Sequence, residues 1–381
     1  MARRGDRFGR RVAGALAGVV VVAALLASCS SSGSDDASTP TTTAAPSTSG
    51  SDTTTVRGAP PASPASVAAR PSAGCKTTVA PTTDNQKQGF GTVAAIANRW
   101  YLLDVPSSNT AGHPQPLVLD LHGYLEGATL HAGVSGFSAL GQFAGFVTVT
   151  PQGQGDPVHW DTTLTSPDIT YVDELLDHVE QVACIDRNRE YVTGFSNGAF
   201  LTSVLACTDS DRFAAVAPVS GMRDVPGCQP TRPVPIITFH GTKDTFVVYE
   251  GGVGEGAKKL PAVDSKSSGK TMGDEDQQSA TDILPGDIDD TVPEILQAWS
   301  KRNGCEGKIT ERKVSADADL LQEQCPSGQE AELYRVTGGG HAWPGSVVGA
   351  GLDGVTGHTT TSIDATKLIW AFFQAHPLRQ G

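Results

Sequence analysis

Ser196 lies in the segment Gly194-Phe195-Ser196-Asn197-Gly198, which has the spacing G-x-S-x-G. A strand-like stretch, 190–193, precedes this segment, and a helix-like stretch, 199–207, follows it. A sharp turn between a strand and a helix exposes a serine hydroxyl, and the flanking glycines avoid collisions across the turn. We therefore predict that Ser196 is a nucleophile. We also predict that the backbone N–H of Asn197 faces the negative charge that develops on an attacked carbonyl oxygen.

A nucleophilic serine needs a base, and the base needs a carboxylate that orients it. The stretch 234–239 has the pattern of a buried strand, and Asp244 follows it at the sheet edge where parallel strands hold their sites. A second strand-like stretch, 332–336, leads into a glycine-rich loop that contains His341. We predict that His341 removes the proton of Ser196 during attack and that Asp244 orients the imidazole.

Other polar residues are weaker candidates for these roles. Asp289 and Asp290 lie in a polar run that no strand precedes. His122 and His240 each follow a buried strand, and we interpret both as structural. The remaining histidines are expected in loops or at the surface, and they are His113, His131, His159, His178, His358 and His376.

The loop after the strand-like stretch 117–121 is where a second donor to the oxyanion is expected. We predict that this donor is the backbone N–H of Tyr124, with Gly123 giving the backbone room. Two aromatic side chains are candidates for stacking against a substrate ring. Trp160 lies in a loop after a strand end, and Trp343 is close to His341. Packing within the loops explains both tryptophans equally well.

Strand-like and helix-like stretches alternate from Cys75 onward, which predicts a mainly parallel, doubly wound sheet with helices on both faces. The segment 251–290 is acidic and rich in glycine, and it is predicted to be a polar insertion that borders the site. Strands are expected at 99–105 (at the sheet edge), 117–121, 146–150, 190–193, 213–219, 234–239 and 332–336, and helices at 169–182, 199–207, 293–302 and 363–375.

The N-terminal segment has the order of a secretory signal. Residues 1–11 are basic, residues 12–27 are apolar, and the run ends in Leu26-Ala27-Ser28-Cys29. The apolar run is short for a hydrocarbon core of ~30 Å. Its last four residues resemble the bacterial lipobox, which implies cleavage before Cys29 and a lipid on that cysteine. An ordinary signal peptide with a chance cysteine and an uncleaved anchor are the alternatives.

These observations predict a chain with three parts. Residues 1–28 are a lipoprotein signal peptide, and residues 29–72, rich in Ser, Thr and Pro, are a disordered tether. Residues 73–381 are the folded domain. We expect this domain on the extracellular face of the cell membrane, held by the lipid on Cys29, or secreted.

Seven cysteines occur in the chain, and six remain if Cys29 carries a lipid. Outside the cytosol such cysteines form disulfides more often than metal sites. Short spacing favours Cys207–Cys228 and Cys305–Cys325, which leaves Cys75–Cys184 by elimination. No CxxC pair is present, so we predict no metal site.

The formal net charge of −13 argues against nucleic acid as a partner, because an acidic surface repels polyanions. The sequence contains no glycine-rich phosphate loop, nucleotide fingerprint or metal-ligand spacing. We therefore predict no cofactor.

Several motifs of the chain, and their order along it, resemble those of the polyhydroxybutyrate depolymerase and feruloyl/acetylxylan esterase family. The resemblance spans about residues 75–377 and implies an α/β-hydrolase fold, an extracellular esterase, and Ser196, Asp244 and His341 as the catalytic triad. Tyr124 departs from the small residue or cysteine that is frequent in the family, and the segment 251–290 is longer than usual. The motifs are Leu121-His122-Gly123, Tyr191–Gly198, His240–Asp244, Val248–Gly252, Asn303-Gly304-Cys305 and Gly339–Gly345.

The sequence therefore favours a serine esterase that hydrolyses carboxylic esters through an acyl-enzyme on Ser196. Polyhydroxyalkanoate-type, feruloyl and acetyl-polysaccharide esters, which include polymers, are its candidate substrates. A peptidase or an acyltransferase on the same fold is the first alternative, since the same groups serve amide chemistry. A surface lipoprotein that binds a ligand without catalysis is the second.

Overall fold

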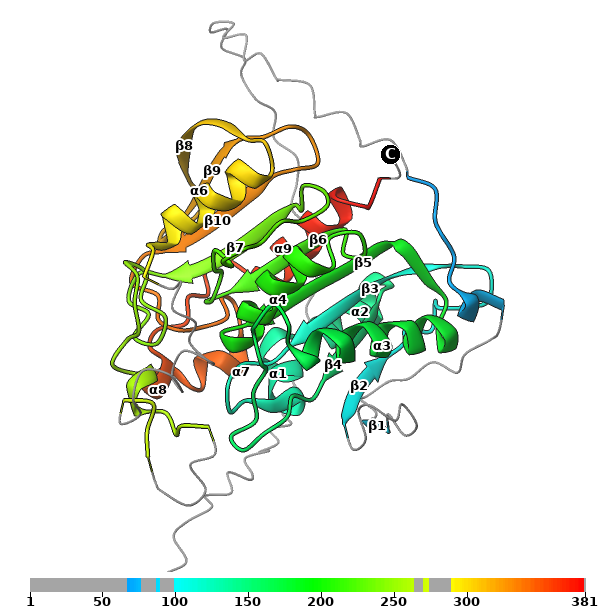
Figure 1. The fold of residues 1–381 in the computed structure, drawn as a ribbon, viewed down its shortest axis with the longest axis horizontal. Helices are drawn as coiled ribbons and strands as arrows, with labels where there is room; N and C mark the ends of the chain where they lie inside the picture. The colour runs from blue at the N-terminus through cyan, green and yellow to red at the C-terminus, as the bar shows by residue number, and fades with distance from the viewer. Residues whose placement is uncertain (1–66, 77–86, 90–98, 264–269, 274–288, 380–381) are drawn as a thin grey trace, which may run out of the picture. The chain divides into compact units, whose positions relative to one another are not determined.

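The computed structural model describes residues 67–76, 87–89, 99–263, 270–273 and 289–379. Within these residues the strands form a ten-stranded sheet in the order β1-β2-β4-β3-β5-β6-β7-β10-β9-β8 (Figure 1). The strands are β1 (Lys87–Gly89), β2 (Trp100–Asp104), β3 (Gln115–Leu121), β4 (Val147–Pro151), β5 (Ile185–Phe195), β6 (Ala215–Val219), β7 (Ile236–Gly241), β8 (Glu306–Lys313), β9 (Ala318–Gln324) and β10 (Ala331–Val336).

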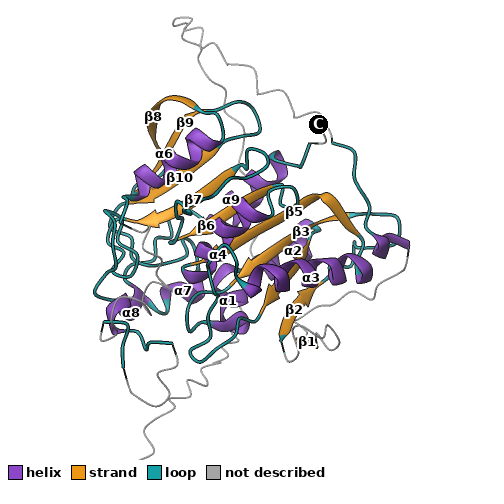
Figure 2. Cartoon of the chain, viewed as in Figure 1, coloured by secondary structure: helices purple, strands orange, loops and turns teal. Residues whose placement is uncertain are grey.

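Helices cover both faces of the sheet (Figure 2). The α-helices are α1 (Gly127–Ser135), α2 (Phe137–Ala144), α3 (Pro167–Val182), α4 (Asn197–Thr208), α6 (Val292–Arg302), α7 (Val347–Ala350), α8 (Asp353–Thr356) and α9 (Ala365–Ala375). Two 3-10 turns, η1 (Ala73–Lys76) and η2 (Ala257–Lys259), complete the helical elements of the described residues.

The centre of the sheet is parallel and its two flanks are antiparallel. Strands β4, β3, β5, β6, β7 and β10 pair in parallel, whereas β1 and β2 on one side and β9 and β8 on the other pair antiparallel. The prediction of a mainly parallel, doubly wound sheet is therefore confirmed for the centre. The prediction that 99–105 forms an edge strand is wrong, because β2 lies between β1 and β4. Strand β8 was not predicted, since its side chains are charged and exposed.

Two apolar clusters hold the helices against the sheet. One joins residues of α3, α4 and α6 to one face, with Trp299 among its fully buried members. The other joins residues of α1, α2 and α9 to the opposite face, where Phe373 stacks on Tyr191 with ring centroids 4.5 Å apart. Removal of this apolar surface from water is the main term that stabilises the layers.

Local signals explain where the helices begin. The hydroxyl of Ser166 accepts from the N–H of Asp168 at 3.0 Å, and Pro167 occupies the first turn of α3. Thr291 and Glu294 form a reciprocal capping box at the start of α6. Both arrangements satisfy N–H groups that have no acceptor within a helix.

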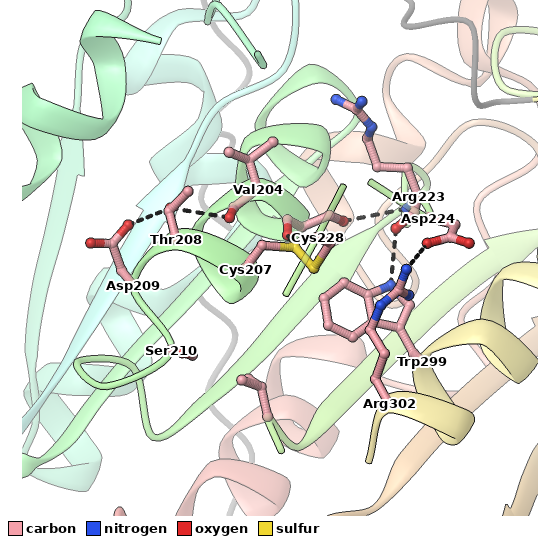
Figure 3. The surroundings of a disulfide bond; sticks show 12 residues. Val204, Cys207, Thr208, Asp209, Ser210, Arg223, Asp224, Cys228, Trp299 and Arg302 are labelled. Carbon is pink, nitrogen blue, oxygen red and sulfur yellow. Dashed lines mark hydrogen bonds and ion pairs between the residues drawn. A yellow bond between two sulfur atoms is a disulfide. The ribbon is translucent and has the colours of Figure 1, made fainter. Parts of the chain in front are cut away.

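Three disulfides are present in the described residues, and their pairing agrees with the prediction: Cys75–Cys184, Cys207–Cys228 and Cys305–Cys325. Figure 3 shows the second of them, which joins the last turn of α4 to the loop after β6. The same loop is fastened to α6, because the indole N–H of Trp299 donates to the carbonyl of Arg223 at 2.9 Å. Arg302 of α6 also pairs with Asp224.

The folded part of the chain extends further towards the N-terminus than residue 73. The N–H of Arg70 donates to the carboxylate of Asp186 at 2.8 Å, and the amide of Asn188 donates to the carbonyl of Ala68 at 2.8 Å. Residues 67–72 therefore pack against the domain, and the predicted boundary of the tether at residue 72 is wrong. The signal peptide and the rest of the predicted tether lie outside the described residues. None of the described helices is long and apolar enough to cross a bilayer.

The insertion predicted at 251–290 lies only partly within the described residues. In that part, Ala257 and Met272 are buried beside Phe200 of α4 and Val247. The hydroxyl of Tyr124 donates to the carbonyl of Pro261 at 2.8 Å. The described part of the segment is therefore not only polar, as predicted, but also packs an apolar surface beside the start of α4.

Candidate active site

Ser196 occupies a strained turn between β5 and α4. Its backbone angles are φ 55° and ψ −118°, a conformation that costs a non-glycine residue on the order of 1–3 kcal/mol. A Cβ atom on Gly194 would lie 2.4 Å from the carbonyl oxygen of Gly198, and one on Gly198 would lie 2.3 Å from that of Leu121. Both glycines of the motif are thus required by close backbone contacts, as predicted.

Asn197 fastens this turn to a neighbouring loop. Its side-chain oxygen accepts from the N–H of Trp160 at 2.7 Å, and its side-chain amide donates to the carbonyl of Trp160 at 3.1 Å. The backbone N–H of Asn197 is the first of α4, and N–H groups in a first helical turn have no acceptor within the helix. This N–H is therefore well suited to the predicted interaction with an oxyanion.

Asp244 and His341 meet although 97 residues separate them in the chain, and their side chains are 2.7 Å apart between Oδ2 and Nδ1. The other carboxylate oxygen of Asp244 accepts from the N–H groups of Phe246 at 2.8 Å and Val247 at 3.0 Å. With Nδ1–H donated to Asp244, Nε2 is the nitrogen left to accept a proton. The imidazole contacts the rings of Phe195 and Phe246, with centroids 4.8 and 4.9 Å away.

Glycines bring the loops of Asp244 and His341 together. A Cβ atom on Gly241 would lie 2.3 Å from the carbonyl oxygen of Gly339, and one on Gly340 would lie 2.3 Å from that of Thr356. The N–H of His341 donates to the same Thr356 carbonyl at 2.7 Å. The glycine-rich stretch before His341 therefore serves close backbone packing.

His122 and His240 are structural, as interpreted from the sequence. His122 accepts from the N–H of Gly153 at Nε2 (2.8 Å) and contacts the carbonyl of Gly123 at Nδ1 (2.8 Å), so it is neutral. Burial lowers the pKa of His122 to about 4. His240 lies 2.8 Å from the carbonyl of Val247 and holds the turn after β7, and burial lowers its pKa as well.

The turn that follows β3 leaves one backbone N–H available. The N–H of Gly123 donates to the carboxylate of Glu126 at 2.6 Å, and that of Leu125 donates to the carbonyl of Val158 at 2.9 Å. Among the described residues, the N–H of Tyr124 has no such acceptor. This agrees with the role that we predict for it.

A cavity of about 260 Å³ is lined by several of the residues predicted to act in catalysis. Ser196, His341 and Tyr124 line it together, with apolar side chains around most of the remaining wall. Several of these apolar side chains are also exposed, namely Leu125, Leu130, Leu352 and Val355.

The two tryptophans differ in their surroundings. Trp160 is fully buried, does not line the cavity, and donates its indole N–H to the carbonyl of His122 at 2.9 Å. The prediction that Trp160 contacts substrate is therefore wrong, and its packing role is the correct alternative. Trp343 does line the cavity, although it is 1% exposed and its indole N–H donates to Thr366 at 2.9 Å.

Two histidines expected in loops or at the surface are buried. His376 contacts the carboxylate of Glu330 at 2.6 Å. His131 lies between Asp120 and Glu126 near the cavity and had no assigned role. A signal for it was present in the sequence, because Asp120 interrupts an apolar strand and a buried carboxylate needs a partner.

The strand order and the position of the serine after β5 define the class of the chain, which has the α/β-hydrolase fold. The predicted fold class is confirmed. The described residues contain no group of three or more His, Cys, Asp or Glu side chains arranged to hold a metal ion.

The sequence is similar to those of curated esterases. It is 24% identical over 254 residues to feruloyl esterase B of Piromyces equi, covering 64% of this chain and 42% of that protein. It is 30% identical over 169 residues to probable feruloyl esterase C of Aspergillus flavus, covering 42% of this chain and 60% of that protein. It is 36% identical over 145 residues to poly(3-hydroxyalkanoate) depolymerase C of Paucimonas lemoignei, covering 36% of this chain and 34% of that protein.

These relatives are of the kinds that the motifs predicted, feruloyl esterases and a polyhydroxyalkanoate depolymerase. The chain matches less than two thirds of the length of each of the three. No family model matches it.

Proposed function

We propose that the chain is a serine esterase that hydrolyses carboxylic esters through an acyl-enzyme on Ser196. The observation that carries the proposal is the 2.7 Å contact between Asp244 and His341 beside a cavity that Ser196 also lines. The strained conformation of Ser196 supports it, because strain of this kind gathers at functional sites. The relatives named as esterases support the same chemistry.

The reaction starts with attack of the Ser196 hydroxyl on the ester carbonyl carbon. Nε2 of His341 takes the hydroxyl proton, and Asp244 stabilises the resulting imidazolium. The N–H groups of Tyr124 and Asn197 donate to the oxygen that becomes negative. When the carbon–oxygen bond breaks, His341 gives its proton to the leaving alcohol.

Water completes the cycle. His341, neutral again, removes a proton from a water molecule as its oxygen attacks the acyl carbon. The acyl–oxygen bond to Ser196 then breaks, and the proton returns from His341 to the serine. The products are a carboxylic acid and free enzyme, and no cofactor enters the balance.

The cavity wall favours an apolar substrate. Leu130 and Leu260 line it, and so do the exposed side chains of Leu125 and Val355. Contact with such a surface removes hydrocarbon from water, whereas sugar hydroxyls would lose hydrogen bonds there. Among the candidate esters we therefore favour hydroxyalkanoate-type and feruloyl esters over acetyl-polysaccharides.

We further propose that the protein acts outside the cell and is held at the membrane by a lipid on Cys29. The three disulfides support an extracytoplasmic location, since such bonds persist in oxidising compartments. The likeness of residues 26–29 to a lipobox supports the anchor.

The test compares the full chain, with its disulfides intact, to two serine variants. Ser196→Ala removes the proposed nucleophile. Ser203→Ala removes a serine of the same helix that does not line the cavity. The substrates are p-nitrophenyl esters of increasing chain length, feruloyl esters, hydroxybutyrate oligomers and acetyl-xylan. A fluorophosphonate reports the reactive serine.

We expect Ser196→Ala to lose several orders of magnitude in kcat and to take no label, as for other triad nucleophiles. Ser203→Ala should keep both the hydrolysis of esters and the reaction with the fluorophosphonate. A labelled protein that cleaves amides or transfers acyl groups but hydrolyses no ester would point to the peptidase or acyltransferase alternative. A protein that neither labels nor turns over any ester would overturn the proposal and favour a binding lipoprotein.

A further inference from the structure

A buried chain of charges runs from the sheet to the cavity. Asp120, near the end of β3, contacts Nε2 of His131 at 2.8 Å, and the opposite ring nitrogen lies 3.1 Å from Glu126. The side chains of Asp120 and His131 are fully buried, and that of Glu126 is 9% exposed. The hydroxyl of Ser135 donates to the second oxygen of Asp120 at 2.5 Å.

The two contacts of His131 determine its charge. Nε2 is hydrogen-bonded to Asp120, and Nδ1 lies within ion-pair distance of Glu126 without the geometry of a hydrogen bond. The carboxylates on both sides favour the imidazole that carries a proton on each nitrogen. Burial alone would lower the pKa of His131, but attraction to Asp120 and Glu126 outweighs burial and raises it to about 10. His131 is thus a buried cation that offsets part of the charge of two carboxylates.

Glu126 connects this cation to the turn that contains Tyr124. Its carboxylate accepts from the N–H of Gly123 at 2.6 Å, and the N–H of Glu126 donates to the carbonyl of Gly123 at 3.2 Å. These two bonds close the turn around Tyr124. Glu126 also lines the same cavity as Ser196, so its charge faces the place where negative charge develops.

The side chain of His131 also contacts the loop that contains His341, the proposed base. The ring of His131 meets that of Trp343 edge-on, with centroids 5.7 Å apart and an angle of 77° between planes. The indole N–H of Trp343 donates to Thr366, whose hydroxyl donates to the carbonyl of Ser135. His131 therefore lies between the loop of Tyr124 and the segment that follows His341.

We propose that Glu126 is a positioning residue that orients the Tyr124 N–H through the Gly123 N–H, and that His131, held by Asp120, neutralises Glu126 for this purpose. The inference rests on the proposed esterase function. Without His131, no cation would offset the charge of the Glu126 carboxylate. That carboxylate would then repel the negative charge of the transition state.

Four variants separate the effect of the hydrogen bond between Glu126 and Gly123 from the effect of the charge of Glu126. Glu126→Gln keeps an oxygen that accepts from Gly123 but removes the charge. Glu126→Ala removes both, while the contact between Asp120 and His131 remains. His131→Gln leaves Glu126 without its cation, and Glu126→Gln/His131→Gln removes both charges. Glu311→Ala, an exposed glutamate on β8 paired with Arg335, is the control.

Values of kcat and KM are measured with a soluble p-nitrophenyl ester and expressed per fluorophosphonate-labelled site. Circular dichroism confirms folding. We expect Glu126→Gln to keep kcat within about threefold and Glu126→Ala to lose on the order of tenfold, less than the 10²–10³ seen when an oxyanion donor is removed outright. His131→Gln should lose on the order of tenfold or more in kcat with little change in KM. The double variant should recover most of that loss.

Equal kcat values for Glu126→Ala and Glu126→Gln would overturn the proposal, whether or not His131→Gln folds. A folded double variant no more active than His131→Gln would overturn the role of charge neutralisation. Wild-type turnover in the same assay separates these results from failure of the esterase proposal, since a wild-type protein with neither turnover nor label would overturn both.

Discussion

The strained backbone of Ser196 is held from several sides by its neighbours. The N–H of Ser196 donates to the carbonyl of Val219 at 2.9 Å, and a Cβ atom on Gly221 would lie 2.6 Å from the carbonyl oxygen of Ser196. Ser220, in the adjoining turn, also has a positive φ of 51° and donates its hydroxyl to the carbonyl of Ala342 at 3.1 Å. The nucleophile turn and the histidine loop are therefore joined through the turn after β6.

The neutral, buried side chain of His122 should make the free energy of unfolding depend on pH below neutrality. Its pKa is lowered to about 4 by burial, whereas an unfolded histidine has a pKa of about 6.5. The unfolded chain therefore binds the proton more tightly, and stability present at neutral pH is lost as pH falls from about 6.5 towards 4. The loss should be at most about 1.4 kcal/mol per pH unit.

Urea unfolding at pH 7, 5.5 and 4.5 measures this dependence. His122→Gln should show a smaller loss of unfolding free energy between pH 7 and 4.5 than the wild type. His113→Gln, at an exposed histidine, serves as the control and should follow the wild type. Identical slopes for all three proteins would contradict the assignment of His122 as the titrating group.

At the level of elements, disulfides fasten both ends of the strand–turn–helix unit that contains Ser196. Cys75–Cys184 joins η1 to the residue before β5, and Cys207–Cys228 joins the end of α4 to the loop after β6. Between them lie the strand and the helix whose junction forms the nucleophile turn. The unit is thus tied at its beginning and at its end.

The two bonds close loops of different length, 109 and 21 residues. From the chain entropy of the unfolded state, we expect Cys75→Ala/Cys184→Ala to lose about 5 kcal/mol of unfolding free energy, and Cys207→Ala/Cys228→Ala about 3 kcal/mol. Guanidinium unfolding under non-reducing conditions checks the order. A larger loss for the shorter loop would show that local packing, such as that around Trp299 in Figure 3, outweighs chain entropy.

At the scale of the whole molecule, the residue of the proposed anchor is distant in sequence from the residues of the proposed active site. Cys29 precedes Val67, where the described contacts of the domain begin, by 38 residues. Loss of the lipid should therefore change location and leave turnover unaltered.

Expression of the full chain in a bacterium that processes lipoproteins tests the anchor. Wild-type protein should enter the detergent phase of a Triton X-114 extraction, and Cys29→Ala should not. Ser30→Ala keeps the cysteine and should behave as the wild type, and kcat/KM of all three should agree within about twofold. Detergent partitioning of Cys29→Ala would contradict lipidation at Cys29.

The sequence alone determined much of the candidate site, because local chemistry carries that information. Glycine is required on both sides of Ser196. A side chain at Gly194 would collide with the backbone of Gly198, and one at Gly198 would collide with the backbone of Leu121. Ser196, Asp244 and His341 each follow a strand-like stretch. Each of these stretches was recognised from the pattern of apolar residues in a short segment of sequence. The pairing of the six cysteines followed from their parity and spacing.

Tertiary structure decided what depends on contacts between distant segments. Trp160 is buried because its backbone bonds Asn197, 37 residues away, and its indole bonds His122. Strand β8 forms because β9 offers backbone partners to a charged segment without an apolar pattern of its own. The charge of His131 arises only where Asp120 and Glu126 enclose it. Burial and ionisation depend on which side chains the fold brings together, and no short window of sequence contains that information.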